Sequence, residues 1–367
     1  MPTEVTLLPN ASTPWASMNN TSPSNEEAHD DVFNEYTGFR VQTWPYVLSI
    51  DIIAALGIVG NILTMVLMTS RTQRRYSYAI YMAFLAVFDS LVLAMIATED
   101  TLDHLHDLLE TFMNSHIVVC KLWLFILESS LIISPWLLMS MSVDRYITVV
   151  HPRYTERVCR PLVSIVVGVI ICVVAMVLVS PLVHAAEYIP DDETKEGYIC
   201  GAVNPALEHY YMFLTAIMES LLPVSLLFGF NIHTVVTLCR STRSVSHIME
   251  ANVRKITISI VLVSVLSALA LVPFAIVFLI EYILIVEDKD EYLIGLFGSL
   301  WHVFNVVRLI NYAMNFYVLI ISSNHHRTML IRKVTCSRNA SQTQMEMTKI
   351  DGNDSRVDTN ISAITEA

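Results

Sequence analysis

The residues of this chain with the clearest capacity for chemistry are ionisable side chains set inside long apolar segments. Glu128, Glu219 and Arg308 each lie among leucine, isoleucine, valine and phenylalanine residues, and Asp89 does so in an earlier segment. A charge inside a hydrocarbon layer is costly unless it meets a partner, so such residues are candidates for ligand or ion sites. The chemistry that they indicate is ion pairing and ligand recognition.

Catalytic motifs do not accompany these residues. No HExxH, GxSxG or paired His and Asp pattern is present, and the 12 histidines are scattered along the chain. We expect no enzyme, no cofactor and no nucleic-acid partner. A membrane transporter remains the weaker alternative, because the sequence does not display the inverted repeats with broken helices that it would need.

The elements that hold these residues are seven apolar segments. The chain has 367 residues, of which 54% are hydrophobic and only 15% charged, more apolar surface than a soluble core could bury. A spanning helix needs about 20 mostly apolar residues. The segments run over Tyr46 to Met68, Ala79 to Ala97, Ile117 to Val143, Leu162 to Val183, Tyr211 to Leu238, Ile256 to Tyr282 and Leu293 to Ser322. They are continuous and do not alternate like barrel strands, so we predict an all-α membrane protein, a seven-transmembrane helix bundle.

Basic residues at the ends of the segments set the orientation. The loops after the first, third and fifth segments carry Arg71, Arg74, Arg75, Arg145, Arg153, Arg157, Arg160, Arg240, Arg243, Arg254 and Lys255. The opposite loops are acidic, with Glu99, Asp100, Asp107, Glu110, Asp191, Asp192, Glu193, Glu287, Asp288 and Asp290 among their residues. We therefore predict a multi-pass plasma-membrane protein whose amino terminus is extracellular.

Four regions follow from this topology. They are an extracellular tail over 1–45, a seven-helix domain over 46–323, an amphipathic eighth helix over 324–336 and a disordered cytoplasmic tail over 337–367. Sequons at Asn10, Asn19 and Asn20 predict glycans on the outer tail.

The same topology leaves two of the six cysteines in the oxidising space. Cys120 and Cys200 lie outside, and we expect them to form a disulfide that ties the loop after the fourth segment to the outer end of the third. Two free thiols in that compartment are the alternative.

The charged residues in the outer half of the bundle predict a ligand cavity. Glu128 lies about 12 Å below Cys120, Glu219 one turn outside Pro223, and Arg308 about two turns outside Asn315. Trp301 and His302 flank them. In one interpretation a carboxylate pairs with a basic ligand group while Arg308 faces a carbonyl or carboxylate. In the other, Arg308 pairs with a glutamate as a buried structural bridge.

Several motifs fall in order along the segments. These are Gly60-Asn61, Leu85-Ala86-Val87-Phe88-Asp89, Ser142-Val143-Asp144-Arg145-Tyr146 followed by His151-Pro152, Pro223, Pro273 and Asn315-Phe316. With the cysteine pair, this set resembles the rhodopsin-like family of G protein-coupled receptors over roughly Tyr46 to Cys336.

The resemblance implies roles for the inner residues. It implies a sodium ion near Asp89, with Asn61 and Asn315 as hydrogen-bonding neighbours, although a structural polar cluster fits equally well. It implies that release of an Asp144–Arg145 ion pair switches the receptor, with Tyr146 and Asn231 contributing to coupling; a snorkelling interfacial arginine is the alternative.

The sequence departs from the family pattern at residues that usually transmit the signal through the bundle. Leu271 stands where a tryptophan is usual, Phe316 and Leu319 stand for a proline and a tyrosine, Asn231 replaces a tyrosine, and the fourth segment lacks its usual tryptophan. Asn231 has an amide that could hydrogen-bond Arg145 in an active state.

Two ligand classes can be tested from the residues. The last segment has no lysine for a retinal Schiff base, and Leu127 occupies the position of the amine-binding aspartate. The chain is most similar to peptide receptors, with FMRFamide-like neuropeptide receptors as the nearest resemblance, through Pro181 with Glu187, Pro223 with Asn231, and the Asn311 to Phe316 stretch. An atypical receptor for a small molecule is the alternative.

Charge at the two ends suits partners on each side of the membrane. Acidic outer loops would attract a cationic peptide, unless they reflect only the depletion of basic residues outside. The basic inner loops could receive a heterotrimeric G protein, the 326–333 segment suits anionic lipid, and Cys336 is a palmitoylation candidate. Hydroxyl residues in the tail predict receptor kinases and arrestin as partners.

Overall fold

The computed structural model describes residues 44–104, 117–190, 198–202, 205–241, 247–286, 291–322 and 326–333. Within these ranges nearly all residues are helical, and seven helices are long and apolar enough to cross a membrane. The predicted seven-helix bundle is therefore confirmed. Asn10, Asn19, Asn20, Arg243, Cys336, the 337–367 tail and most of the acidic outer residues lie outside the described ranges.

The helices are longer than the apolar segments because helical structure continues past the hydrocarbon. The elements are α2 (Trp44–Met68), η1 (Gln73–Arg75), α3 (Ser77–His104), α5 (Ile117–Val150), α6 (Pro152–Val158), α7 (Pro161–Ala185), β1 (Ala186–Pro190), β2 (Tyr198–Ala202), α8 (Pro205–Met212), η2 (Phe213–Leu221), α9 (Leu222–Ser241), α10 (His247–Val286) and α11 (Glu291–Ser322). Residues 326–333 form a further helical segment.

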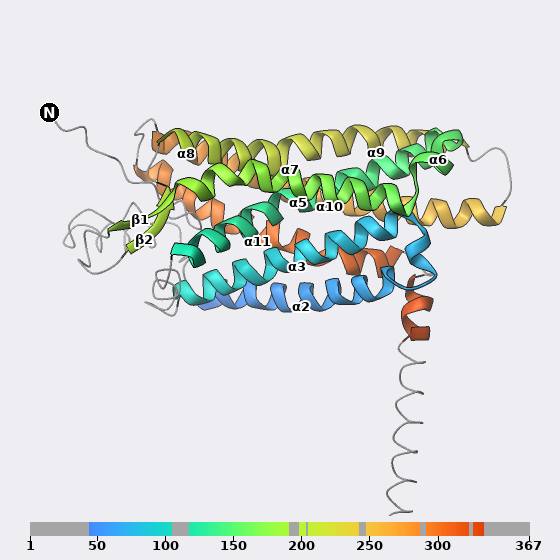
Figure 1. Ribbon diagram of the computed structural model, residues 1–367, viewed down its shortest axis with the longest axis horizontal. Helices are drawn as coiled ribbons and strands as arrows, with labels where there is room; N and C mark the ends of the chain where they lie inside the picture. The colour runs from blue at the N-terminus through green and yellow to red at the C-terminus, as the bar shows by residue number, and fades with distance from the viewer. Residues whose placement is uncertain are drawn as a thin grey trace, which may run out of the picture. The chain divides into compact units, whose positions relative to one another are not determined.

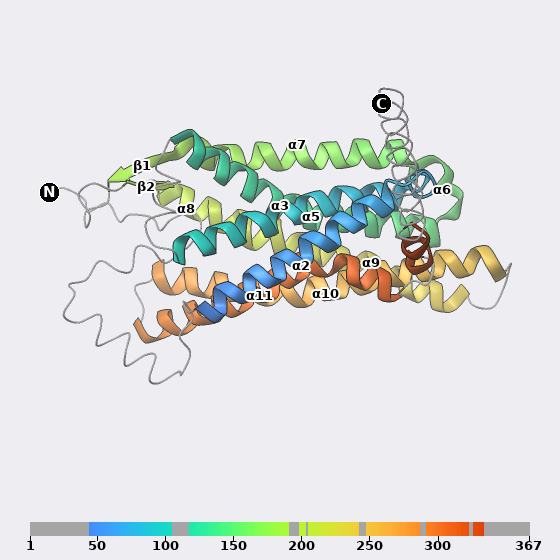
Figure 2. The ribbon, with the colours of Figure 1, turned by 90° about the horizontal axis from the view of Figure 1, so that it is seen from below.

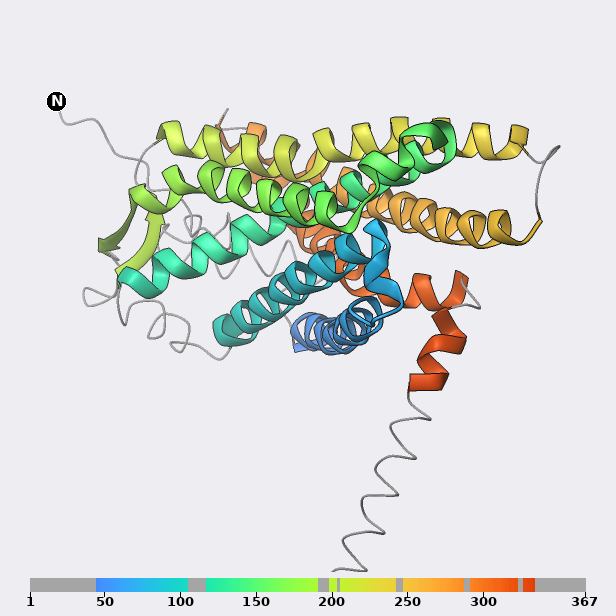
Figure 3. The ribbon, with the colours of Figure 1, turned by 45° about the vertical axis from the view of Figure 1, so that its right-hand side comes forward.

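The spanning helices run alongside one another, with the β1–β2 hairpin at one end and α6 at the other (Figures 1 and 2). Helix α5 is the central element, since it contacts α3, α7, η2, α9 and α10. Figure 3 shows α2 and α3 adjacent on one side of the bundle. The outward face of α7 is rich in exposed valine, isoleucine and leucine, as expected of a helix that meets lipid.

Close helix packing depends on one glycine in α2. A Cβ built on Gly57 would lie 2.5 Å from Leu93 Cδ1 and 2.7 Å from Ala313 Cβ. Gly57 therefore allows α2 to approach α3 and α11 at once. The apolar cluster around it includes Ile50, Leu93 and Tyr312.

The loop after the fourth span contains an antiparallel hairpin that the sequence did not predict. β1 pairs with β2, with Tyr188 opposite Cys200. The hairpin contacts α5, and Lys121 Nζ donates to His184 O at 3.4 Å. Cys120 is disulfide-bonded, and its pairing with Cys200 remains our prediction.

Candidate functional site

A π-helix in the fifth span positions Glu219. The segment η2 covers Phe213–Leu221 and ends two residues before Pro223, and the N–H of Leu222 donates to Ile217 O. Proline has no N–H with which to continue the α-helical ladder, and π-turns commonly mark functional sites. Trp136 Nε1 holds the turn from α5 by donating to Met218 O at 2.8 Å. Glu219 is consequently buried, facing α11.

Arg308 is the partner of Glu219. Its Nη1 donates to Glu219 Oε1 at 3.0 Å, and its Nε and Nη2 both donate to Asn305 Oδ1, at 3.2 and 2.9 Å. Tyr312 Oη donates to the same Glu219 oxygen at 3.3 Å, and the guanidinium carbon lies 4.1 Å from the ring centroid of Phe274. The buried bridge that the sequence left open is therefore present in this conformation.

Glu128 adds a second carboxylate to this centre. It is buried on α5, near enough to Glu219 and Arg308 for their charges to interact. No hydrogen bond from the Glu128 carboxyl to any other described residue is found, whereas Arg308 directs its donors to Glu219 and Asn305. The charge of Arg308 therefore acts on two buried carboxyl groups, but its hydrogen bonds go to Glu219 and Asn305.

The predicted flanking residues Trp301 and His302 lie next to this centre. Trp301 packs with Phe274 and Phe278, and its ring meets that of His302 edge-on at 5.0 Å. His302 in turn meets Tyr46 of α2 at 5.3 Å. Trp301 Nε1 and His302 Nδ1 are both buried without a hydrogen-bond partner. A series of aromatic contacts therefore connects Tyr46 of α2 with Phe274, whose ring packs against Arg308.

Glu281 is a candidate that sequence reasoning missed. It is 1% exposed, and neither carboxyl oxygen has a hydrogen-bond partner. Its spacing from Phe274, Val277 and Phe278 puts it on the same face of α10, above the cluster that contains Trp301. The signal in the sequence was this spacing. It lies next to Tyr282, the last residue of the predicted span, where a carboxylate can also face water.

Asp89 lies at the centre of a separate polar network, deeper in the bundle. Ser134 Oγ donates to Asp89 Oδ1 at 2.5 Å, and Asn315 Nδ2 donates to Asp89 Oδ2 at 2.6 Å. Asn61 donates instead to the backbone oxygen of Tyr312 at 3.2 Å, and its own Oδ1 is buried without a partner. Sequence reasoning identified Asn315 but missed Ser134, because a serine in a helix commonly bonds only to its own backbone.

The inner end of α5 holds an ion pair between neighbouring residues. Arg145 donates from Nη2 and Nε to Asp144 Oδ2, at 2.5 and 3.1 Å. Its guanidinium carbon lies 5.1 Å from the ring centroid of Tyr78 in α3, and both charged side chains are buried. The arginine is therefore held inside the bundle instead of snorkelling to the surface.

Two further residues predicted for coupling lie near this pair. Tyr146 packs against Phe230 and His233 of α9, and its hydroxyl is 3.4 Å from His151 Nε2. Asn231 is buried and its Nδ2 has no hydrogen-bond partner. Within the described part of the chain, Asn231 does not bond Arg145 in this conformation.

Comparison with known families agrees with this architecture. The family model described as 7 transmembrane receptor (rhodopsin family) matches residues 60–329. The match begins within α2 and contains the Asp89 network, the Asp144–Arg145 pair and the Glu219–Arg308 pair.

Proposed function

Since the chain belongs to the rhodopsin family of seven-transmembrane receptors, we propose that its extracellular ligand is a neuropeptide carrying a basic group and that it activates a heterotrimeric G protein. Members of this family are multi-pass signalling receptors. We further propose residence in the plasma membrane with the amino terminus outside, as the positive-inside rule indicates. Glycans on Asn10, Asn19 and Asn20 and the Cys120–Cys200 disulfide are part of this proposal.

The observation that carries the ligand proposal is an excess of buried carboxyl groups over buried cations in the outer half. Arg308 forms its salt bridge with Glu219, and among the described residues neither Glu128 nor Glu281 forms a salt bridge of its own. Both carboxyl oxygens of Glu281 are buried without a hydrogen-bond partner. Buried ionisable groups are stable only when neutralised or paired. A basic ligand group would supply the missing charge.

Unpartnered donors nearby fit a peptide. Trp301 Nε1 is buried and unsatisfied, and it can donate only to an acceptor such as a backbone carbonyl oxygen. Peptides present carbonyl oxygens at regular intervals beside their basic side chains or amino terminus. A ligand with both groups would satisfy atoms that this conformation leaves unpaired.

Binding assays on single variants test this proposal. A library of amidated neuropeptides is screened on cells expressing the protein, and the active peptide is compared on Glu128→Gln, Glu281→Gln and Arg308→Ala at equal surface expression. We expect each glutamine variant to lose potency for that peptide and to retain more for an analogue without its basic group. The control is Glu156→Gln, an exposed carboxylate on α6 at the opposite end of the bundle. Unchanged potency in both glutamine variants would remove the carboxyl groups from the ligand site.

The inner end supports coupling to a G protein. Arg240 is exposed at the end of α9, and Arg254 and Lys255 are exposed about two turns into α10, on the side to which Arg145 belongs. A basic rim around a buried, releasable arginine suits an acidic or polar helix of a signalling partner. We predict that receptor kinases and arrestin act on the 337–367 tail and that Cys336 is palmitoylated; both lie outside the described residues. Contact of the 326–333 segment with anionic lipid is also a prediction.

A sodium ion near Asp89 is a further part of the proposal. Sodium prefers oxygen ligands, and the Asp89 carboxylate, the Ser134 hydroxyl and the unpartnered Asn61 Oδ1 supply oxygens from three helices. Asp89 and Ser134 would hold the ion directly, while Asn315 keeps the carboxylate oriented. The bound ion would supply positive charge that neutralises Asp89 within the bundle.

A further inference from the structure

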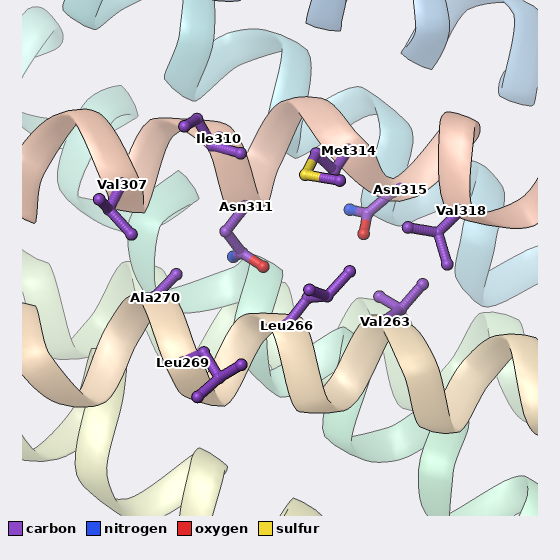
Figure 4. Close-up of a pocket in the computed structure, with 10 residues that line it drawn as sticks. All are labelled: Val263, Leu266, Leu269, Ala270, Val307, Ile310, Asn311, Met314, Asn315 and Val318. Atoms are coloured by element: carbon purple, nitrogen blue, oxygen red, sulfur yellow. The ribbon is translucent and has the colours of Figure 1, made fainter.

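A cavity of about 140 Å³ lies between α10 and α11. Figure 4 shows Val263, Leu266 and Ala270 of α10 facing Val307, Asn311 and Met314 of α11 across it. These helices lie in the sixth and seventh spans. The cavity is separate from the outer cluster around Arg308, since neither Arg308 nor any of the buried glutamates lines it.

The rim of this cavity faces the bilayer. Leu269 is 65% exposed and Ile310 is 36% exposed, one from each helix, and both line the cavity. Val263 lies eight residues after Lys255 in α10, or about 12 Å along the helix axis, which puts it within the hydrocarbon. Molecules dissolved in the membrane can therefore reach the cavity from the side.

Asn311 supplies an unused donor at this apolar site. Ser267 Oγ donates to Asn311 Oδ1 at 2.6 Å, and no partner for Asn311 Nδ2 is found among the described residues. An amide nitrogen carries two hydrogens, and Ser267 is the single side chain bonded to this amide within the described ranges. At least one N–H is therefore unpaired there, whichever way the amide is turned. An unpaired N–H in hydrocarbon is costly, so an acceptor placed here is stabilising.

We infer that this cavity binds a small, weakly polar amphiphile from the bilayer. A dry cavity of about 150 Å³ in another protein accommodates benzene, so the apolar part of the ligand is about the size of one aromatic ring. Its polar part is a single hydroxyl, ether or carbonyl oxygen that accepts from Asn311. An unsubstituted alkyl chain would fill the space but leave the amide unpaired.

The position of the cavity predicts an effect on conformation. Asn315 lines it and also donates to Asp89, so the occupant adjoins the Asp89 network. A ligand between α10 and α11 favours the arrangement in which the two helices stay apart at this level.

Photolabelling tests the site without relying on signalling. The protein is placed in phosphatidylcholine nanodiscs and irradiated with a diazirine derivative of 4-propylphenol, with unlabelled 4-propylphenol as competitor. We expect saturable labelling of residues that line the cavity. Ala270→Phe, which fills the space, should reduce it by about tenfold, a loss equivalent to about 1.4 kcal/mol. The control is Leu262→Phe, on the same helix, 45% exposed and not lining the cavity, which should retain it.

Two results would overturn the inference. One is labelling spread over the exposed apolar residues of α7 as strongly as over α10 and α11, with no competition. The other is photolabelling of both Ala270→Phe and Val307→Phe to the same extent as the unaltered protein. Should Ala270→Phe fail to fold, Val307→Phe and the competition on the unaltered protein decide the matter. Asn311→Leu separates the polar contact from the apolar one, since it should weaken competition by 4-propylphenol more than competition by propylbenzene.

Discussion

Arg308 in α11 donates to Glu219 in η2 at 3.0 Å, while its guanidinium carbon lies over the ring of Phe274 of α10, 4.1 Å from the centroid. One side chain therefore joins three spans in the outer half of the bundle. The integrity of this buried pair should affect both stability and ligand binding.

Removing Arg308 should destabilise the protein more than removing both members of the pair. Arg308→Met leaves Glu219 buried and uncompensated, a loss of about 3–5 kcal/mol, whereas Arg308→Met with Glu219→Leu leaves no unpaired charge. The melting temperature of the purified protein in detergent measures this. A double variant less stable than Arg308→Met alone would show that the two residues do not act as a pair.

Substitution of glycine by alanine should be tolerated at Gly229 but should destabilise the protein at Gly57. Gly57→Ala puts a Cβ 2.7 Å from Ala313 Cβ and 2.9 Å from its Cα, so α2 must move away, at a cost of about 1–3 kcal/mol. Gly229→Ala meets nothing within 4 Å and gains up to about 1 kcal/mol of helix propensity. Melting temperatures should fall for the first variant and stay level or rise for the second. Equal effects would contradict the close contact of α2 with α11.

Weakening the inner ion pair should raise activity without ligand. Asp144→Asn removes the charge that holds Arg145 at 2.5 Å, and each 1.4 kcal/mol or so lost from the inactive state raises the active population about tenfold. Ligand-free GTP exchange on added G protein measures this. The control, Glu156→Gln on α6, should keep native exchange. Native exchange in Asp144→Asn would mean that the pair does not restrain the receptor.

Sodium should stabilise the protein through Asp89. At a concentration about 100 times its dissociation constant, a bound ion adds about 2.7 kcal/mol to stability. The melting temperature should rise when sodium chloride replaces N-methylglucamine chloride at constant ionic strength, and Asp89→Asn should abolish that rise. If the melting temperature of Asp89→Asn still rises, the rise is a general effect of sodium chloride on the protein and not of an ion bound at Asp89.

The spans could be predicted from the sequence because apolar length is a direct requirement of the bilayer. Their ends could not, since α10 begins at His247 and α3 continues to His104, beyond the hydrocarbon. The π-helix at Phe213–Leu221 could not be predicted either, because it depends on Pro223 and on the Trp136 bond from another span. The hairpin after α7 likewise depends on packing against α5.

The types of site residue were more predictable than their pairings. Glu128, Glu219 and Arg308 could be identified because charges in apolar runs are rare, but sequence spacing did not say which glutamate Arg308 meets. The π-turn decides this by turning Glu219 toward α11. Ser134 was missed because hydroxyl groups are common in spans. Glu281 was missed because it lies next to the end of the predicted span, whereas helix α10 continues past it to Val286.

Ligand-dependent GTP exchange tests the central claim most directly. The purified protein, in nanodiscs with a heterotrimeric G protein, is exposed to the amidated neuropeptide library. We predict that at least one basic peptide accelerates exchange, and that Glu128→Gln and Glu281→Gln shift its potency while ligand-free exchange stays native. Failure of every peptide to accelerate exchange, together with ion flux or substrate uptake without agonist, would contradict the proposed peptide receptor.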